Sequence, residues 1–371
     1  MKLIAQVKLT PTKEQHQALL KTLESVNDAA NYISDHAWET QTFRQYDLHH
    51  LLYYDLRNRF KLTAQIVVRV LAKVADAYKV DRRVKRAFNL HGSIAYDKRI
   101  LSWKTADQLV SIWTLDGRLK VPFVAGDRQL EMLRHLSGET DLVYRDGYFY
   151  LFQTCEVEEP PEGDPAEFLG VDLGIVNIAA DSDGQIYSGG QVNGLRKRHS
   201  KLRAKLQSKD TKASKRLLKK RSKKERRFAT HVNHVISKSI VAKAEDTGRG
   251  IALEDLSGIR DRIMVCHSQR RQHHSWAFNQ LRQFIEYKAK LAGILVSLVA
   301  PRNTSRTCPV CGCIDKHNRP SQSLFSCVSC GFSAPADTVA AGIIAGRAVV
   351  NRPYFSPVPG GVGQGKAVCF S

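Results

Sequence analysis

The sequence has no long uninterrupted apolar segment. Its longest apolar stretch runs from Leu291 to Pro301, well short of the roughly 18 consecutive apolar residues that a membrane-spanning helix needs. The first 20 residues lack the apolar centre of a secretory signal, because they are interrupted by Lys2, Lys8, Lys13 and Glu14. We therefore expect a cytoplasmic protein with no membrane partner.

Acidic residues are scarce relative to basic ones. The 371 residues include 36 Asp and Glu against 57 Lys and Arg, which gives a formal net charge of +21. An excess of this size favours a polyanionic partner, and nucleic acid is the first candidate. With 43% hydrophobic residues, the chain can bury a sizeable core, which its length would divide over two or three domains.

Cysteines are few outside one short region. Five of the eight lie between Cys308 and Cys330, a clustering that argues for a metal site and against a disulfide framework. Two Cys-x-x-Cys pairs are separated by fifteen residues, the spacing of a four-thiolate tetrahedral zinc site. A site with four protein ligands has no open position, so we expect one structural Zn²⁺. Its predicted ligands are Cys308, Cys311, Cys327 and Cys330.

The first half of the chain changes its apolar period twice. Alternating apolar residues predict strands in residues 1–11 and 96–158, which we interpret as one antiparallel β-barrel or sheet. Helical spacing in residues 12–95 predicts a helical domain inserted into it. Residues 159–167 are acidic and contain prolines, so we expect a linker there.

The second half alternates short apolar strands with helices. We interpret residues 168–302 and 333–350 as an α/β domain carrying a basic helical insertion at 196–227, with the cysteine region, 303–332, inserted as a ribbon. The Pro- and Gly-rich residues 351–371 are predicted to be a flexible tail. The predicted fold class is therefore multidomain α+β.

Three acidic residues stand where strands end or a helix begins. Asp172 and Glu254 each end an apolar strand, and Asp337 begins an Ala-rich helix. In α/β folds these positions converge on one sheet edge, where carboxylates would repel one another unless a cation lay among them. Oxygen ligands favour Mg²⁺ or Mn²⁺. Two such ions could activate the attacking water and stabilise the leaving 3′-oxygen of a phosphodiester.

Other interpretations of these acids stay open. Each could be an ordinary turn or helix-cap residue. Asp172-Leu-Gly174 also fits the phosphate-contacting hairpin of actin-like ATPases. Against an ATPase, the sequence shows no second glycine-rich phosphate loop, and its charge of +21 is unusual for such an enzyme.

Basic residues are concentrated between Arg196 and Arg227, where 17 Lys or Arg occur against Asp210 and Glu225. Such a run can clamp phosphates with little sequence preference, whereas an ordinary charged run is as often a solvated helix. Its position just after the first carboxylate strand favours the phosphate clamp. A second basic patch, with an aromatic residue for base stacking, follows near residue 270. The candidate nucleic-acid contacts are Arg196, Lys197, Arg203, Lys219, Lys220, Arg221, Lys223, Lys224, Arg226, Arg227, Arg270, Arg271 and Trp276.

The ordered motifs resemble those of the TnpB family. They are Gly170-Val-Asp172-Leu-Gly, Ile251-Ala-Leu-Glu254-Asp-Leu-Ser-Gly, the two cysteine pairs, and Ala336-Asp337 with Ala340-Ala341. In that family they form three RuvC motifs and a zinc ribbon. The resemblance is close in the second half and looser in the first.

The resemblance implies an RNA-guided DNA endonuclease with a RuvC-like, RNase H-like domain. Its partners would be a guide RNA from the transposon end and double-stranded target DNA beside a short transposon-adjacent motif, bound by a monomeric ribonucleoprotein. It assigns Asp172, Glu254 and Asp337 as catalytic ligands of two Mg²⁺ or Mn²⁺ ions. The barrel would be a wedge domain and residues 12–95 a recognition domain.

The sequence departs from the family pattern at two positions. Val339 stands where the family usually carries Asn, and Pro335 where a polar residue is common. A nuclease-deficient RNA-guided repressor is therefore an alternative, although all three acids are present. A compact type V CRISPR effector is another, because the sequence does not reveal the source of the guide.

Overall fold

The computed structural model describes residues 1–256 and 278–350. It divides into two compact units, Met1–Glu158 and Glu159–Ser371. The predicted linker, residues 159–167, begins at this division. The predicted contacts Arg270, Arg271 and Trp276 and the predicted tail, 351–371, lie outside the described residues.

The N-terminal unit is built on a seven-stranded antiparallel sheet of order β2-β6-β7-β1-β5-β4-β3. The opening strand β1 lies at its centre, between β7 and β5. The Tyr96 hydroxyl of β2 donates to the Trp113 carbonyl of β4 at 3.2 Å, so the two ends of the strand order approach each other and the sheet is nearly closed. The strands are β1 Lys2–Leu9, β2 Ile94–Tyr96, β3 Leu101–Lys104, β4 Leu109–Thr114, β5 Gly117–Val124, β6 Leu136–Arg145 and β7 Tyr148–Glu156.

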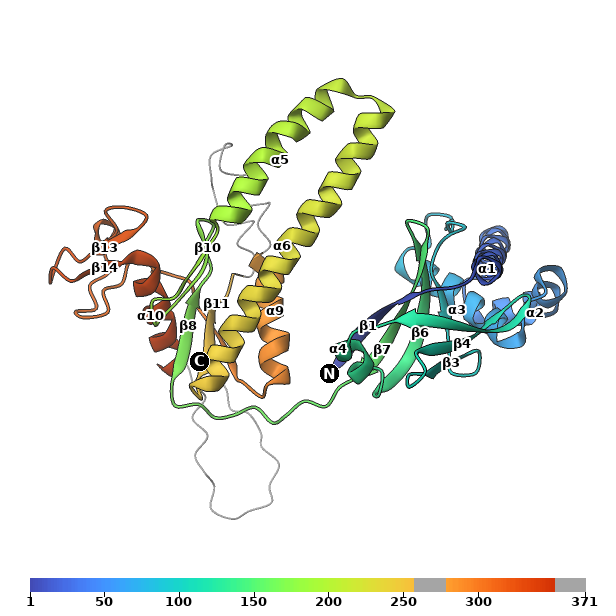
Figure 1. The fold of residues 1–371 in the computed structure, drawn as a ribbon, viewed down its shortest axis with the longest axis horizontal. Coiled ribbons are helices and arrows are strands. Elements are labelled where there is room, and N and C mark those ends of the chain that lie inside the picture. Colours follow the sequence, from blue (N-terminus) through green and yellow to red (C-terminus); the bar gives the residue numbers. More distant parts are fainter. Residues whose placement is uncertain (257–277, 351–371) are drawn as a thin grey trace, which may run out of the picture. The chain divides into compact units, whose positions relative to one another are not determined.

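Three helices separate β1 from β2 in the sequence (Figure 1). They are α1 Lys13–Glu39, α2 Gln45–Phe60 and α3 Ala64–Val80. Thr12 caps α1, because its hydroxyl accepts from the Gln15 N–H while the Gln15 side chain accepts from the Thr12 N–H. The helical pattern predicted as far as residue 95 is too long: residues 81–93 form neither helix nor strand. The structure adds a short helix, α4 Asp127–Met132, which the sequence pattern did not predict.

The second unit contains a five-stranded sheet of order β10-β9-β8-β11-β12. Strands β8, β9 and β10 form an antiparallel meander, whereas β11 pairs in parallel with both β8 and β12. The strands are β8 Phe168–Asp172, β9 Asn177–Asp181, β10 Ile186–Ser188, β11 Gly250–Glu254 and β12 Val296–Val299. The predicted strands at 168 and 251 are therefore neighbours in one sheet.

Helices cover both faces of this sheet because its central strands are apolar on both sides. Leu169 and Val171 pack with helices α6 Lys212–Asp246 and α9 Phe278–Leu291. Phe168 packs on the opposite face with α10 Ala336–Val350. A Cβ atom at Gly170 would lie 1.9 Å from the Ala341 carbonyl oxygen, so only glycine lets α10 pack this closely on β8.

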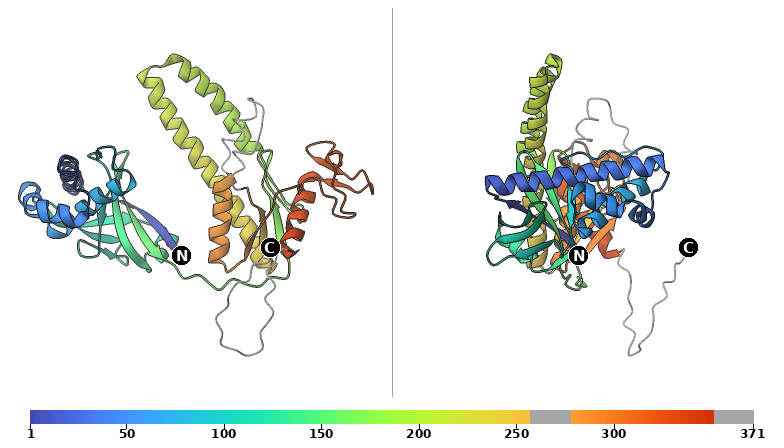
Figure 2. Two further views of the ribbon diagram at one scale, coloured as in Figure 1. Left: turned by 180° about the vertical axis from the view of Figure 1, so that it is seen from behind. Right: turned by 90° about the vertical axis from the view of Figure 1, so that its right-hand side faces the viewer.

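The basic run forms most of a helical hairpin. Helix α5 Gly190–Lys209 and helix α6 run side by side and extend beyond the sheet of their unit (Figures 1 and 2). The cysteine region contains the small hairpin β13 Leu324–Ser326 and β14 Ser333–Pro335, with a short 3₁₀ turn, η1 Lys316–Asn318. No helix within residues 1–256 and 278–350 is long and apolar enough to cross a membrane.

Candidate functional site

The three predicted carboxylates lie at one edge of the five-stranded sheet. Asp172 is the last residue of β8 and Glu254 the last of β11, and these strands are parallel neighbours with Val171 opposite Leu253. Helix α10 begins at Ala336 and packs on β8. This packing places Asp337, in the first turn of α10, at the same edge of the sheet.

The carboxylates act on one another electrostatically. The pKa of Asp172 is raised from 3.8 to about 7, first by burial and then by the negative charges of Glu254 and Asp337. The positive charge of Arg319 and a backbone N–H at Leu173 oppose this rise in pKa. Burial also raises the pKa of Glu254, while a hydrogen bond from Thr304 and the charge of Arg347 oppose that shift. The edge is therefore a site where negative charge is poorly compensated.

Polar side chains from three other segments hold these carboxylates. Asn177 Nδ2 donates to Asp337 Oδ2 at 2.8 Å, and Arg319 Nη2 donates to Asp337 Oδ1 at 3.1 Å. The Thr304 hydroxyl donates to Glu254 Oε1. Both oxygens of Asp337 are thus engaged, one by a neutral amide and one by a guanidinium group.

Sequence reasoning did not assign these three partners. Asn177 follows the glycine bend after Asp172, and Thr304 lies just before the first cysteine pair, so position in a motif could have indicated both. Arg319 lies in the loop between the cysteine pairs, where no spacing rule singles it out. Its role became visible only when the fold placed the ribbon beside α10.

Val339, the departure from the family pattern, is a packing residue. It is 5% exposed and belongs to a buried cluster with Cys308, Phe325, Cys327 and Ala336. Its side chain therefore packs the start of α10 against the cysteine region. Because valine has no polar group, it makes no hydrogen bond to Asp337.

The four predicted cysteine ligands form a close cluster. Their sulfur atoms all lie within 4.8 Å of one another, with Cys308 and Cys330 3.6 Å apart and Cys311 and Cys327 3.5 Å apart. Gly312 and Gly331 follow the two pairs with φ of 72° and 75°, the left-handed conformation that lets each knuckle turn. Four thiolates in this arrangement could bind a structural zinc ion. Cys313 lies outside this group of four.

The carboxylates are more loosely arranged than the cysteines. Among the described residues, the close grouping of potential metal ligands occurs at the four thiols and not at the three acids. Asp337 instead accepts hydrogen bonds from Asn177 and Arg319, and Glu254 accepts one from Thr304. Their donor chemistry nevertheless suits a hard divalent cation, because burial and mutual repulsion both oppose ionisation of Asp172.

Part of the basic run is structural and part faces solvent. Glu225 of α6 accepts from Arg203 of α5 at 2.8 Å and lies 3.4 Å from His199 Nδ1. Burial lowers the pKa of Arg196, which Glu225 partly offsets. These contacts join the two helices. Of the predicted contacts, Arg196, Arg203 and Arg221 are half-buried, and the exposed ones are Lys197, Lys219, Lys220, Lys223, Lys224, Arg226 and Arg227.

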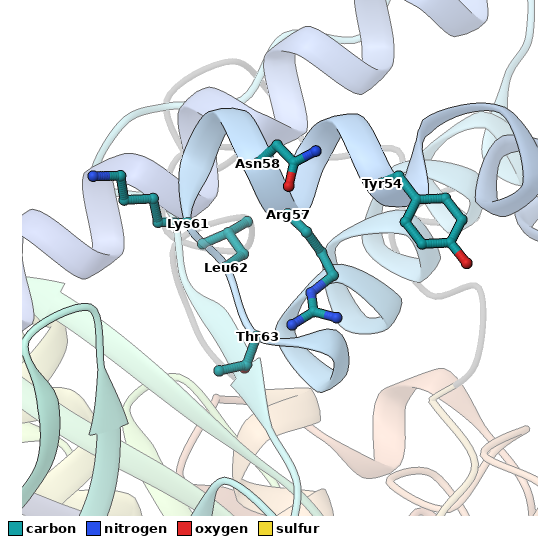
Figure 3. A pocket seen from close by; sticks show the side chains of 6 residues that line it. All are labelled: Tyr54, Arg57, Asn58, Lys61, Leu62 and Thr63. Carbon is teal, nitrogen blue, oxygen red and sulfur yellow. The ribbon is translucent and has the colours of Figure 1, made fainter.

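A hollow of about 540 Å³ lies on the N-terminal unit at the end of α2. Figure 3 shows the side chains that line it, with Lys61 pointing away from Arg57 and Thr63. All its lining residues belong to positions 54–63, so it includes none of the carboxylates or cysteines described above.

Comparisons with known proteins match the second half of the chain to two families. Residues 152–257 match the model OrfB_IS605, described as a probable transposase. Residues 278–344 match the Cas12f1-like TNB domain. These two regions include all three carboxylates and all four clustered cysteines.

Curated relatives match the chain over part of its length. A TnpB-like protein of Methanocaldococcus jannaschii is 37% identical over 145 residues, which cover 39% of this chain and 51% of the relative. The CRISPR-associated endodeoxyribonuclease Cas12f1 of Sulfoacidibacillus thermotolerans is 42% identical over 119 residues, 32% of this chain and 27% of the relative. The matched region thus spans about half or less of each relative.

One solved structure shares the fold over nearly the whole chain. It is a structure of the mini-RNA-guided endonuclease CRISPR-Cas_phi3, with a TM-score of 0.57 and 10% sequence identity, covering 96% of this chain and 94% of that one. At this identity the likeness concerns the mixed α+β fold alone.

Proposed function

We infer from the confirmed resemblance to the TnpB family that this chain is an RNA-guided DNA endonuclease. The observation that carries the proposal is the gathering of Asp172, Glu254 and Asp337 at one sheet edge, where burial and then the charges of the other two acids raise the pKa of Asp172 to about 7. Carboxylates placed this way bind divalent cations in enzymes that cut phosphodiesters.

The topology of the second unit supports a RuvC-like, RNase H-like nuclease domain. Three antiparallel strands are followed by two parallel ones, in the order β10-β9-β8-β11-β12. Asp172 and Glu254 lie at the carboxyl ends of the parallel strands β8 and β11, the edge where α/β sheets bind their ligands, and Asp337 lies in the first turn of α10.

Asp172, Glu254 and Asp337 would hold Mg²⁺ or Mn²⁺. Two such ions supply the positive charge that activates a water molecule and stabilises the leaving 3′-oxygen. The chain's own residues orient the acids: Asn177 and Arg319 hold Asp337, and Thr304 holds Glu254. The charge of Arg319, which opposes the rise in the pKa of Asp172, could offset the negative charge of a phosphate as well.

The proposed partners are a guide RNA and a double-stranded DNA target. The net charge of +21 and the exposed lysines and arginines of the α5–α6 hairpin suit two sugar–phosphate backbones, while base pairing with the guide would supply sequence specificity. The nearly closed sheet, 1–11 and 96–158, would form the wedge domain and residues 12–95 the recognition domain. We propose a monomer in a ribonucleoprotein that cuts beside a short transposon-adjacent motif.

Two related functions remain as alternatives. The match to the Cas12f1-like TNB domain favours a compact type V effector guided by a CRISPR array, which differs in the source of the guide. The valine at position 339 favours a cleavage-deficient repressor, but its burial beside the ribbon leaves all three acids in place.

The proposal is tested by sequencing the RNA that copurifies with the protein and programming that guide against a plasmid library with randomised flanking sequence. We expect Mg²⁺-dependent cleavage beside one short motif. Omission of Mg²⁺ should stop cleavage while leaving guide binding intact. Binding to the target without cleavage would favour the repressor, and copurification of no defined RNA would contradict a guided enzyme.

A further inference from the structure

We propose that Asn177 is a positioning residue that fixes Asp337 in its metal-binding orientation. The inference rests on the proposed nuclease function and concerns the same carboxylates. Asn177 Nδ2 donates to Asp337 Oδ2 at 2.8 Å, across 160 residues of sequence. It is the one neutral amide that reaches this carboxyl group among the hydrogen bonds of the described residues.

The backbone around Asn177 is fixed by a tight bend. Strands β8 and β9 pair antiparallel with Asp172 opposite Ala180, so Asn177, at the start of β9, extends beyond Asp172 at the same edge. The Gly174 N–H donates to the Ile178 carbonyl at 3.2 Å. A Cβ atom at Gly174 would lie 2.6 Å from the Asn177 carbonyl oxygen, so glycine lets the chain turn back this sharply and present Asn177 to α10.

Two further contacts hold the bend from the helix side. Asn193 Nδ2 donates to the Ile175 carbonyl at 2.9 Å, and the Gly189 N–H donates to the Val176 carbonyl at 2.9 Å. The bend is therefore held at Ile175 and Val176, the two residues that precede Asn177. A side chain on such a support can orient its partner without being reoriented by it.

The two donors to Asp337 differ in what they do to its charge. Arg319 at Oδ1 is a cation, so it competes electrostatically with a metal ion. Asn177 at Oδ2 is neutral, so it can fix the carboxyl group while leaving its negative charge available to a cation. Neutral outer partners of this kind typically account for a 10- to 100-fold difference in metal affinity or activity.

The position two residues after Asp337 supplies no such amide. Val339 is apolar and buried against Phe325 and the cysteine knuckles. The amide that orients Asp337 in this chain therefore comes from Asn177, the first residue of β9, and not from α10 itself.

The test compares two substitutions of equal size and chemistry in the full-length, zinc-loaded protein. Asn177→Leu removes the donor to Asp337, whereas Asn58→Leu makes the same exchange at an exposed position of α2, which is not part of the carboxylate site. Asn177→Ala is measured alongside, because it deletes the amide without adding bulk. Mn²⁺ binding is followed by electron paramagnetic resonance, with Asp172→Ala defining the signal that belongs to the carboxylates. The Mg²⁺ dependence of guided cleavage is measured in parallel, and melting temperature monitors folding.

We expect Asn177→Leu and Asn177→Ala to weaken Mn²⁺ binding by about 10-fold or more and to recover cleavage as Mg²⁺ is raised. Asn58→Leu should keep nearly the wild-type metal requirement. Unchanged Mn²⁺ affinity in both Asn177 variants, or an equal loss in Asn58→Leu, would overturn the positioning role while the nuclease proposal stands. Absence of any Asp172-dependent Mn²⁺ binding or cleavage in the unsubstituted protein would instead overturn the nuclease proposal itself.

Discussion

At the scale of single residues, the raised pKa of Asp172 has a consequence for stability. In the unfolded chain this carboxyl group loses its proton near pH 3.8, but in the folded protein only near pH 7. Between these values the folded state binds more protons than the unfolded state. The contribution of Asp172 to the free energy of unfolding of the metal-free, zinc-loaded protein should therefore fall as pH rises from about 4 to about 7.

Asp172→Asn tests this dependence, because it keeps the shape of the side chain and removes its charge. We expect the variant to be more stable than the unsubstituted protein near pH 7 and to show a flatter stability profile between pH 4 and 7, measured by denaturant titration without divalent metal. Mg²⁺ should stabilise the unsubstituted protein and not the variant. If the free energy of unfolding depended on pH in the same way in both proteins, the pKa of Asp172 would not be raised in the folded state.

The acids were accessible to sequence reasoning, whereas Arg319 was not. Asp172 and Glu254 end apolar strands and Asp337 begins a helix, and local patterns mark such positions. Arg319 reaches Asp337 from the loop between the two cysteine pairs. Its position depends on how the cysteine region folds against α10, a tertiary property that periodicity and spacing do not encode.

At the scale of elements, the α5–α6 hairpin should contribute affinity for nucleic acid without sequence preference. Lys219, Lys220 and Lys224 are exposed on α6. Replacing all three by Gln should weaken guide RNA binding. A plot of the logarithm of the binding constant against the logarithm of the salt concentration should also become less steep, by about 0.7 to 0.9 for each phosphate that the variant no longer neutralises.

The matched control for the hairpin replaces the same three lysines by Arg, which keeps the charge. We expect nearly unchanged RNA affinity in the arginine variant, measured by filter binding across a salt series. If the Gln and Arg variants bound equally well, the run would be only a solvated charged helix.

The cysteine region should depend on zinc for its structure. It contains one small two-stranded sheet and few buried apolar side chains, such as Phe325, so thiolate coordination would supply most of its folding energy. Cys327→Ser should lose the bound zinc and the hydrogen-exchange protection of residues 303–332. Because Val339 and Arg319 link this region to Asp337, cleavage should fall as well.

Cys313→Ser is the control for the zinc site, since Cys313 is near the cluster but outside the four-sulfur group. We expect one zinc per chain in this variant, measured by elemental analysis, and normal exchange protection. Equal zinc loss in both variants would contradict the assigned ligand set.

Element boundaries show where sequence patterns fail. The helical period predicted helix as far as residue 95, but α3 ends at Val80. The following residues are held by side-chain contacts to α1, in which Asn31 and Ser34 bond the backbone at Phe88 and Arg86. Such long-range hydrogen bonds satisfy a non-helical backbone and leave no periodic signal in the sequence.

At the scale of the whole molecule, each unit has a core of its own. Leu71 is fully buried in the N-terminal core and Leu253 in the core of the second unit. Truncating either to Ala should cost about 2 to 5 kcal/mol. We expect Leu71→Ala to speed hydrogen exchange within residues 1–158 alone and Leu253→Ala within the second unit alone. Equal effects in both units from either change would mean that they unfold as one.

The central claim is that three acids from distant parts of the chain form one catalytic centre. Its most direct test measures guided DNA cleavage by Asp172→Ala, Glu254→Ala and Asp337→Ala alongside guide RNA binding. Each variant should lose cleavage by several orders of magnitude and keep its RNA affinity, since residues that act as a unit fail together. Wild-type cleavage by any one of the three would contradict a shared centre.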